Sequence, residues 1–119
     1  MANPNIVNVT SIYGRTNVAN VIDSTTTFIE NGVASGEVYK INSLIISNVD
    51  GSNNAIISVD LYRSSIPTYI VKTVVVPADS SFTAVDKNMS IYLEEGDSIR
   101  LFGSANDHLQ AICSYEVIS

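Results

Sequence analysis

The sequence of 119 residues is poor in the side chains that most catalytic and metal chemistry needs: it has one cysteine, one histidine and no tryptophan. A single cysteine cannot form a disulfide within the chain, and Cys113 lies in an alternating pattern typical of a strand, so we expect it to be a small buried residue. One histidine and one cysteine also cannot supply the four ligands of a structural zinc site. We therefore expect neither an internal disulfide nor a structural zinc site within one copy of the chain.

Charge is scarce as well. Only 15% of the residues are charged, whereas about a quarter is usual for a globular domain. Six Lys and Arg stand against twelve Asp and Glu, which gives a net charge of −6, and the basic residues form no cluster. Because nucleic acids and anionic membranes attract clustered positive charge, we expect no nucleic-acid partner and no membrane partner.

Long apolar runs are missing too. No stretch approaches the roughly 18 apolar residues of a membrane-spanning helix, and residues 1–5 lack the features of a secretion signal. We expect the chain to be made in the cytoplasm of its host. Apolar residues still make up 45% of the sequence, enough for one hydrophobic core. Many apolar and few charged residues together indicate that something other than water covers part of the surface.

What the sequence has in abundance is apolar/polar alternation with a period of two residues. The alternating segments are bounded by Asn, Asp, Gly, Ser and Pro, and helical spacing is absent, so we predict an all-β fold. Roughly eight strands in a chain of this length predict an antiparallel β-sandwich that is jelly-roll-like. The expected strands are 38–48, 55–63, 68–76, 82–85, 90–93, 98–103 and 109–118, and residues 17–22 and 25–30, where the alternation is weaker, could form a further pair.

The connections can be predicted in part. A change of phase at Asn42 and Ser43 predicts a bulge or bend, and residues 50–54 predict a hairpin turn between the flanking strands. Asp23 and Ser24 predict a second hairpin. We divide the chain into residues 1–16, an extended N-terminal arm or an edge strand, and residues 17–119, the sandwich domain. The strand 68–76 has β-branched residues on both faces, which favours burial on both sides or cover by a neighbouring subunit.

The sequence has few candidate catalytic residues. A hydrolase of the Ser-His-acid type needs a base, and His108 lies in a predicted turn beside Asp107, where a solvated loop is the better interpretation. We predict no catalytic residues and no enzymatic activity.

A metal could also be bound by oxygen ligands, without histidine or cysteine. Asp50, Ser52 and Asn54 alternate as at the start of an EF-hand loop, but Leu61 stands where the bidentate Glu belongs, which favours a turn. The three acids Glu94, Glu95 and Asp97 could bind calcium or accept hydrogen bonds from a partner. Acids around a tight turn are more often simply exposed to solvent, and we expect an exposed turn here. We predict no metal and no cofactor.

Tyrosine suggests where a partner binds. Six tyrosines outnumber three phenylalanines, and tyrosine suits a surface half-buried against another protein. Ile56 and Tyr62 fall on the polar side of their strand, and Ile112 and Ile118 fall opposite the core side of theirs. Such positions indicate a second core layer or a subunit interface, and we favour the interface. The candidate interface residues are Ile6, Val7, Val9, Ile12, Tyr13, Ile56, Tyr62, Tyr69 and Ile112.

Three segments carry a family resemblance: IVNVTSIYG at residues 6–14, KINSLIISNVDG at 40–51 and IYLEEGDSI at 91–99. They resemble small virion structural proteins of tailed phages, particularly those of marine cyanophages. The resemblance implies a β-sandwich in the virion, as a capsid decoration or cement protein on the head or as a component of the neck or tail. It provides no catalytic residues.

The residue pattern and the resemblance lead to one hypothesis. Copies would bury apolar and aromatic surface against one another and against a shell, and the N-terminal arm would add to a neighbour's sheet. The expected partners are the major capsid protein or other virion proteins and further copies of the chain, as a trimer or a dimer. The alternatives are a structural protein of the neck or tail and a carbohydrate- or receptor-binding module at the tail tip.

Overall fold

The computed structural model describes residues 11–119 and contains nine strands. In the central strands, such as the one over residues 109–118, buried positions alternate with more exposed ones, because successive side chains of a strand point to opposite faces of its sheet. The strands are β1 (Ile12–Asn20), β2 (Thr26–Glu30), β3 (Val38–Asn48), β4 (Ala55–Arg63), β5 (Ile66–Val76), β6 (Ser81–Val85), β7 (Ile91–Leu93), β8 (Ser98–Gly103) and β9 (Leu109–Ile118).

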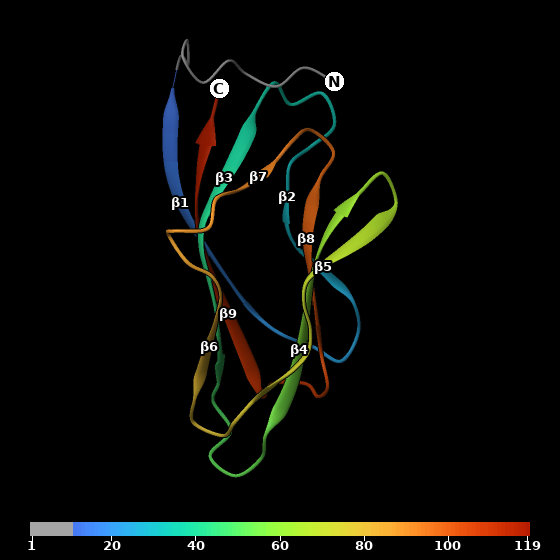
Figure 1. The fold of residues 1–119 in the computed structure, drawn as a ribbon, viewed down its shortest axis with the longest axis vertical. Helices are drawn as coiled ribbons and strands as arrows, with labels where there is room; N and C mark the ends of the chain where they lie inside the picture. Colours follow the sequence, from blue (N-terminus) through green and yellow to red (C-terminus); the bar gives the residue numbers. More distant parts are fainter. Residues whose placement is uncertain (1–10) are drawn as a thin grey trace.

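The strands form two antiparallel sheets that face each other (Figure 1). Sheet A has the order β1-β9-β3-β6, with β7 also paired to β3, and sheet B has the order β2-β8-β4-β5. The predicted all-β antiparallel sandwich is therefore confirmed, and its jelly-roll connectivity stays a prediction. A membrane-crossing helix is not found among residues 11–119.

The core lies between the sheets and follows the predicted alternation. In β9, Leu109, Ala111 and Cys113 are fully buried, and in β8, Ile99 and Leu101 face them from the other sheet. Burial of this many aliphatic side chains, at about 1.5–3 kcal/mol each, supplies the main force for folding. The predicted burial of Cys113 is thus confirmed.

The predicted bulge in β3 is also confirmed. The pairing of β3 with β9 shifts register between Ile41 and Ser43, so that Ile41, Leu44 and Ile46 all reach the core. An extra residue in one strand restores the inward phase in this way.

Both predicted hairpins are wrong, because in each case the chain crosses from one sheet to the other. Residues 50–54 join β3 of sheet A to β4 of sheet B, and the residues around Asp23 join β1 of sheet A to β2 of sheet B. Turn-forming residues specify that the chain reverses, but they do not specify which strand it then joins.

Two buried asparagines hold the sheets together, one at the start of the β2–β3 connection and one at the start of the β3–β4 connection. Asn48, at the end of β3, donates from its side-chain amide to the carbonyl oxygens of Asn53 and Val76, both at 2.9 Å. Asn31, just after β2, donates to the carbonyl oxygens of Glu37 at 2.8 Å and Leu93 at 3.0 Å. Because Val76 and Leu93 lie in the opposite sheet from their donors, each amide ties sheet A to sheet B.

Strand β5 is an edge strand of sheet B, and most of its residues are exposed. The prediction that the chain itself buries both faces of β5 is therefore wrong. Its β-branched residues reflect strand propensity rather than burial. Cover by a neighbouring subunit stays a prediction.

The first described strand, β1, forms the other long edge, in sheet A. Ser11 and Ser119 extend its pairing with β9 through two backbone hydrogen bonds, of 3.1 and 3.0 Å. The expected boundary at residue 16 falls inside β1. Residues 1–10, which contain most of the expected arm, lie outside the described residues.

Candidate interaction surfaces

The outer face of sheet A carries a row of apolar side chains that crosses three strands. Val18 of β1 lies opposite Ile112 of β9, which in turn lies opposite Ile45 of β3. Val18 is 66% exposed and Ile112 is 44% exposed, while Ile45 is half-buried. We call Val18, Ile112 and Ile45 the apolar row.

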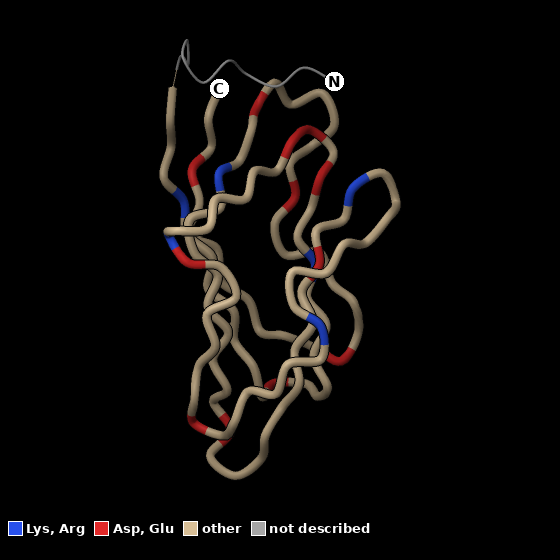
Figure 2. Tube along the Cα trace, in the orientation of Figure 1, with Lys and Arg blue, Asp and Glu red and all other residues tan. Residues whose placement is uncertain are grey.

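The surroundings of the apolar row are polar but uncharged. Next to the row, the same strands carry serine, threonine, asparagine and glutamine on this face, and the charged pair Lys40 and Glu116 lies on the same face further along the strands. Most other charged residues lie toward the ends of the strands and in the loops (Figure 2). Because hydroxyl and amide groups cost less to remove from water than charges do, this face can be covered by a protein at low cost. The uncharged neighbours of the row are Thr16, Asn20, Ser43, Ser47, Ser81, Thr83, Gln110 and Ser114.

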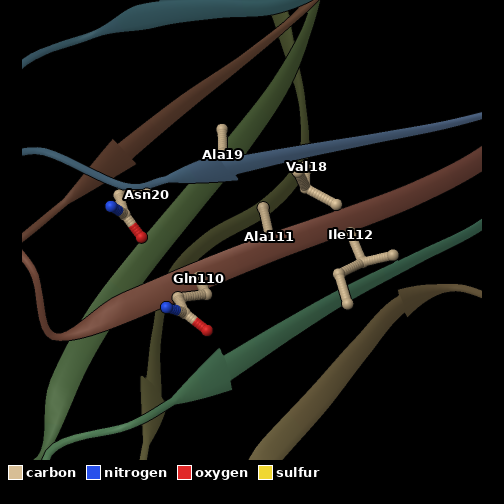
Figure 3. Close-up of a pocket in the computed structure, with 6 residues that line it drawn as sticks. All are labelled: Val18, Ala19, Asn20, Gln110, Ala111 and Ile112. Atoms are coloured by element: carbon tan, nitrogen blue, oxygen red, sulfur yellow. The ribbon is translucent and has the colours of Figure 1, made fainter.

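A depression of about 410 Å³ lies beside the row, between β1 and β9. The amides of Asn20 and Gln110 lie at one end of it, and Val18 and Ile112 lie at the other (Figure 3). None of the six lining residues ionises, so this hollow offers van der Waals contact and amide hydrogen bonds but no acid–base chemistry.

The outer face of sheet B has a second exposed apolar group. Ile56 of β4 lies opposite Val75 of β5, and Phe102 of β8 lies nearby, opposite Ser58. All three apolar side chains are exposed. A small depression between Ile56 and Phe102 reaches Thr73 and Ser104.

The basic residues of sheet B are held by partners within the chain. Arg100 binds the Asp60 carboxylate through two hydrogen bonds of 2.9 Å, and its guanidinium lies 3.8 Å from the centre of the Tyr62 ring. These bonds raise the pKa of Arg100 above its usual value. Lys72 Nζ lies 4.9 Å from the centre of the Tyr69 ring. Both tyrosine rings therefore already have a cation over one face.

The acidic turn of residues 94–97 is a structural element rather than an exposed loop. Asp97 is buried, accepts two hydrogen bonds from Arg63 Nε and one of 2.6 Å from Nη2, and accepts another from the Glu94 amide. Glu95 is buried as well and accepts from the Gly36 amide at 3.0 Å. The expectation of an exposed turn is wrong for Asp97 and Glu95. The hydrogen bonds that Arg63 donates to the Asp97 carboxylate raise the pKa of Arg63.

His108 is placed differently from the prediction. Its Nε2 lies 3.2 Å from Asp50 Oδ2, and its ring is partly buried rather than solvated beside Asp107. Asp50 is occupied by its own turn, because Oδ1 accepts the amides of Ser52 and Asn53, which lowers the pKa of Asp50. Within residues 11–119, no three or more His, Cys, Asp and Glu side chains gather in a way that could hold a metal ion.

The structure distributes the candidate interface residues over several surfaces. Ile12 and Tyr13, at the start of β1, are 54% and 59% exposed, Ile112 lies on the outer face of sheet A, and Ile56 and Tyr69 lie on that of sheet B. Tyr62 is half-buried under Arg100. Ile6, Val7 and Val9 lie outside the described residues. Ile118, which we expected on an exposed face, is buried.

Sequence reasoning missed three exposed residues of these surfaces, namely Val18, Val75 and Phe102. Phe102 could have been found, because it alternates with the inward Ile99 and Leu101 and so falls on the outer face. The row formed by Val18 could not, because it depends on strand pairing between β1, β9 and β3.

Comparison with solved structures supports the fold. No family model matches the chain, and no curated protein matches its sequence. A protein of Bacillus endospore appendages, described as a novel family of disulfide-linked pili, is similar in structure, with a TM-score of 0.52, 16% sequence identity, and coverage of 90% of this chain and 85% of the other. At this identity the similarity establishes the sandwich fold alone.

Two further structures are of a pentameric capsid protein isolated from metagenomic phage sequences. Their TM-scores are 0.45 and 0.44, their identities to this chain are 15% and 13%, and each match covers 85% of this chain. This chain spans only 60% and 59% of the length of those capsid chains. All these neighbours are structural proteins of assemblies, a pilus and a capsid.

Proposed function

We propose that this protein is a non-enzymatic structural component of a phage virion, most specifically a decoration or cement protein of the capsid. The observation that carries the proposal is the outer face of sheet A, where the apolar row is exposed among uncharged neighbours. Isolated exposed apolar residues are ordinary, but a row in register across three strands is typical of a surface that a partner covers.

The placement on a virion is supported by the resemblance of residues 6–14, 40–51 and 91–99 to small virion proteins of tailed phages. Repetition would strengthen such a contact, because many copies bound to one lattice bind with far greater avidity than a single copy. The major capsid protein is the expected shell partner.

The described side chains favour assembly over catalysis. The acids nearest to one another, at residues 94–97, are engaged by Arg63 and by backbone amides. Burial raises the pKa of the Cys113 thiol to about 12, so it is neither a nucleophile nor accessible for a disulfide between copies. Disulfide linkage, the property described for the pilus protein, is therefore not proposed for this chain.

A carbohydrate-binding role at a tail tip is less well supported. Sugar rings stack on open aromatic faces, whereas Tyr62 lies beneath Arg100 and Tyr69 lies near Lys72. A structural protein of the neck or tail remains the alternative placement.

Purified phage particles test the proposal. Quantitative mass spectrometry should detect the protein at a copy number comparable to that of the major capsid protein, and antibody labelling should place it on the head. Absence from purified particles would reject a virion role, and labelling restricted to the tail would reject the decoration role.

A further inference from the structure

Strand β1 presents a long and regular sheet edge. It pairs with β9 on one side over nine residues, from Ile12 to Asn20, with no shift of register, and no described strand pairs with its other side. The Asn17 side chain donates to the Phe28 carbonyl oxygen at 2.9 Å, which ties β1 to the opposite strand of sheet B. The edge is therefore held in place and carries a row of backbone groups available for pairing.

The other edges of the described sandwich are blunted, as edges of natural sheets usually are. Strand β5 contains Pro67, a positive φ at Thr73 and two shifts of register. Strands β2 and β6 have five residues each and one shift of register each, and β7 has three residues. Strand β1 has no proline, no positive φ and no bulge.

A segment suited to this edge lies in the same chain, outside the described residues. Residues 5–10 read Asn-Ile-Val-Asn-Val-Thr, which is rich in β-branched residues and has no charge, and β1 has Arg15 as its one charged residue. At about 3.3 Å per residue, the first ten residues can span about 33 Å, close to the length of the nine-residue β1.

This segment is poorly suited to fold back on its own β1. A hairpin would need a tight turn where residues 1–10 join β1, but Val9, Thr10, Ser11 and Ile12 include no Gly, Pro, Asn or Asp. Ser11 is also fixed opposite Ser119 by backbone hydrogen bonds. The segment that leaves β1 can instead meet the free edge of another copy.

This inference rests on the proposed virion role and on the association between copies that the sequence predicts. We propose that residues 5–10 of one copy add as an antiparallel strand to the free edge of β1 in a second copy, which returns the same contact about a two-fold axis. With Ser11 nearest the axis, Ile6 lies opposite Thr16 of the other copy, and Val7 and Val9 fall on the face of Tyr13. The added strand covers Ile12 and Tyr13, whose side chains are more than half exposed.

Disulfide trapping in the full-length chain tests this pairing. Residues opposed across antiparallel strands have Cα atoms about 4.5–5.5 Å apart, which suits a disulfide. The test protein carries Ile6→Cys together with Thr16→Cys, and the native Cys113 does not compete because it is buried. One matched control joins Ile6→Cys to Thr68→Cys on the β5 edge, and others carry each substitution alone.

After mild oxidation, we expect a covalent dimer of the Ile6→Cys/Thr16→Cys protein at a level several-fold above every control. Replacing Thr16→Cys by Gly14→Cys or Val18→Cys allows for a different register. A disulfide within one chain, equal trapping at Thr68, or no trapping at any β1 position would overturn the proposal. Far-ultraviolet circular dichroism confirms that each variant is folded.

Light scattering of the wild-type protein separates this proposal from the proposed function. A wild-type dimer whose β1 variants do not cross-link would refute the strand pairing and leave self-association intact. A wild-type monomer at every concentration would refute both the pairing and self-association in solution, whereas the particle experiment decides the virion role independently.

Discussion

Removing the side-chain amide of Asn31 should destabilise the protein more than any surface substitution. Asn31 is 0% exposed, and its amide donates to the carbonyl oxygens of Glu37 and Leu93 while its Oδ1 accepts from Ser35 Oγ at 2.6 Å. In Asn31→Ala these partners lose their hydrogen bonds inside the protein. At about 0.5–1.5 kcal/mol for each of these three bonds, the loss is about 1.5–4.5 kcal/mol.

Thermal and urea unfolding followed by circular dichroism measure this loss. For a chain of this size, about 1.5–4.5 kcal/mol corresponds to a fall in Tm of roughly 6–18 °C. Asn31→Asp should be at least as damaging, because it places a carboxylate oxygen against two carbonyl oxygens. The matched control is Asn88→Ala, at an exposed residue, where we expect a change within about 0.5 kcal/mol. If Asn31→Ala were as mild as this control, the buried amide would not be holding the two sheets together.

Three further predictions concern the apolar row, the thiol and the pH dependence. Ile112→Ser should weaken binding to the particle with little change in Tm, measured by co-sedimentation with capsids, and Ser81→Ala at the edge of the same face should have little effect on either. Cys113 should react with a thiol reagent only after unfolding, because burial raises its pKa to about 12; rapid reaction of the native protein would contradict this. The pKa of Asp50 is lowered in the folded state, so its contribution to stability is present above its unfolded value, near 3.8, and is lost as pH falls through the folded value. Between pH 5 and about pH 2, Asp50→Asn should therefore lose less urea resistance than wild type, and an equal loss would contradict this account.

The strands could be predicted closely because alternation reports burial directly. The predicted bounds of β4, β8 and β9 match the structure, since each of these strands has one apolar face and clear turn residues at its ends. The bulge in β3 was visible as a change of phase. Connections between strands were not predictable in the same way, because which strand pairs with which depends on packing across the two sheets.

Polar burial was the other feature that the sequence did not reveal. Asn31, Glu95 and Asp97 lie in connections between predicted strands and Asn48 ends a predicted strand, yet all four are buried with hydrogen-bond partners. Such a residue is buried when a neighbouring strand end supplies a partner, and the partners Leu93 of Asn31 and Val76 of Asn48 are distant in sequence. The apolar row as a whole could not be predicted either, because it depends on pairing between strands that are distant in sequence. Its member Ile112 was predicted from the alternation within its own strand.

The most direct test of the account is to compare solvent access to the outer faces before and after assembly. Hydroxyl-radical labelling read by mass spectrometry can report on Val18, Ile112, Phe102 and Tyr69 in the isolated protein and in purified particles. We predict strong labelling of the apolar row in the isolated chain and a large decrease on the particle, with core residues such as Leu44 unlabelled in both. Equal labelling of Val18 and Ile112 in the two states would show that no neighbour covers this face and would contradict the proposed structural role.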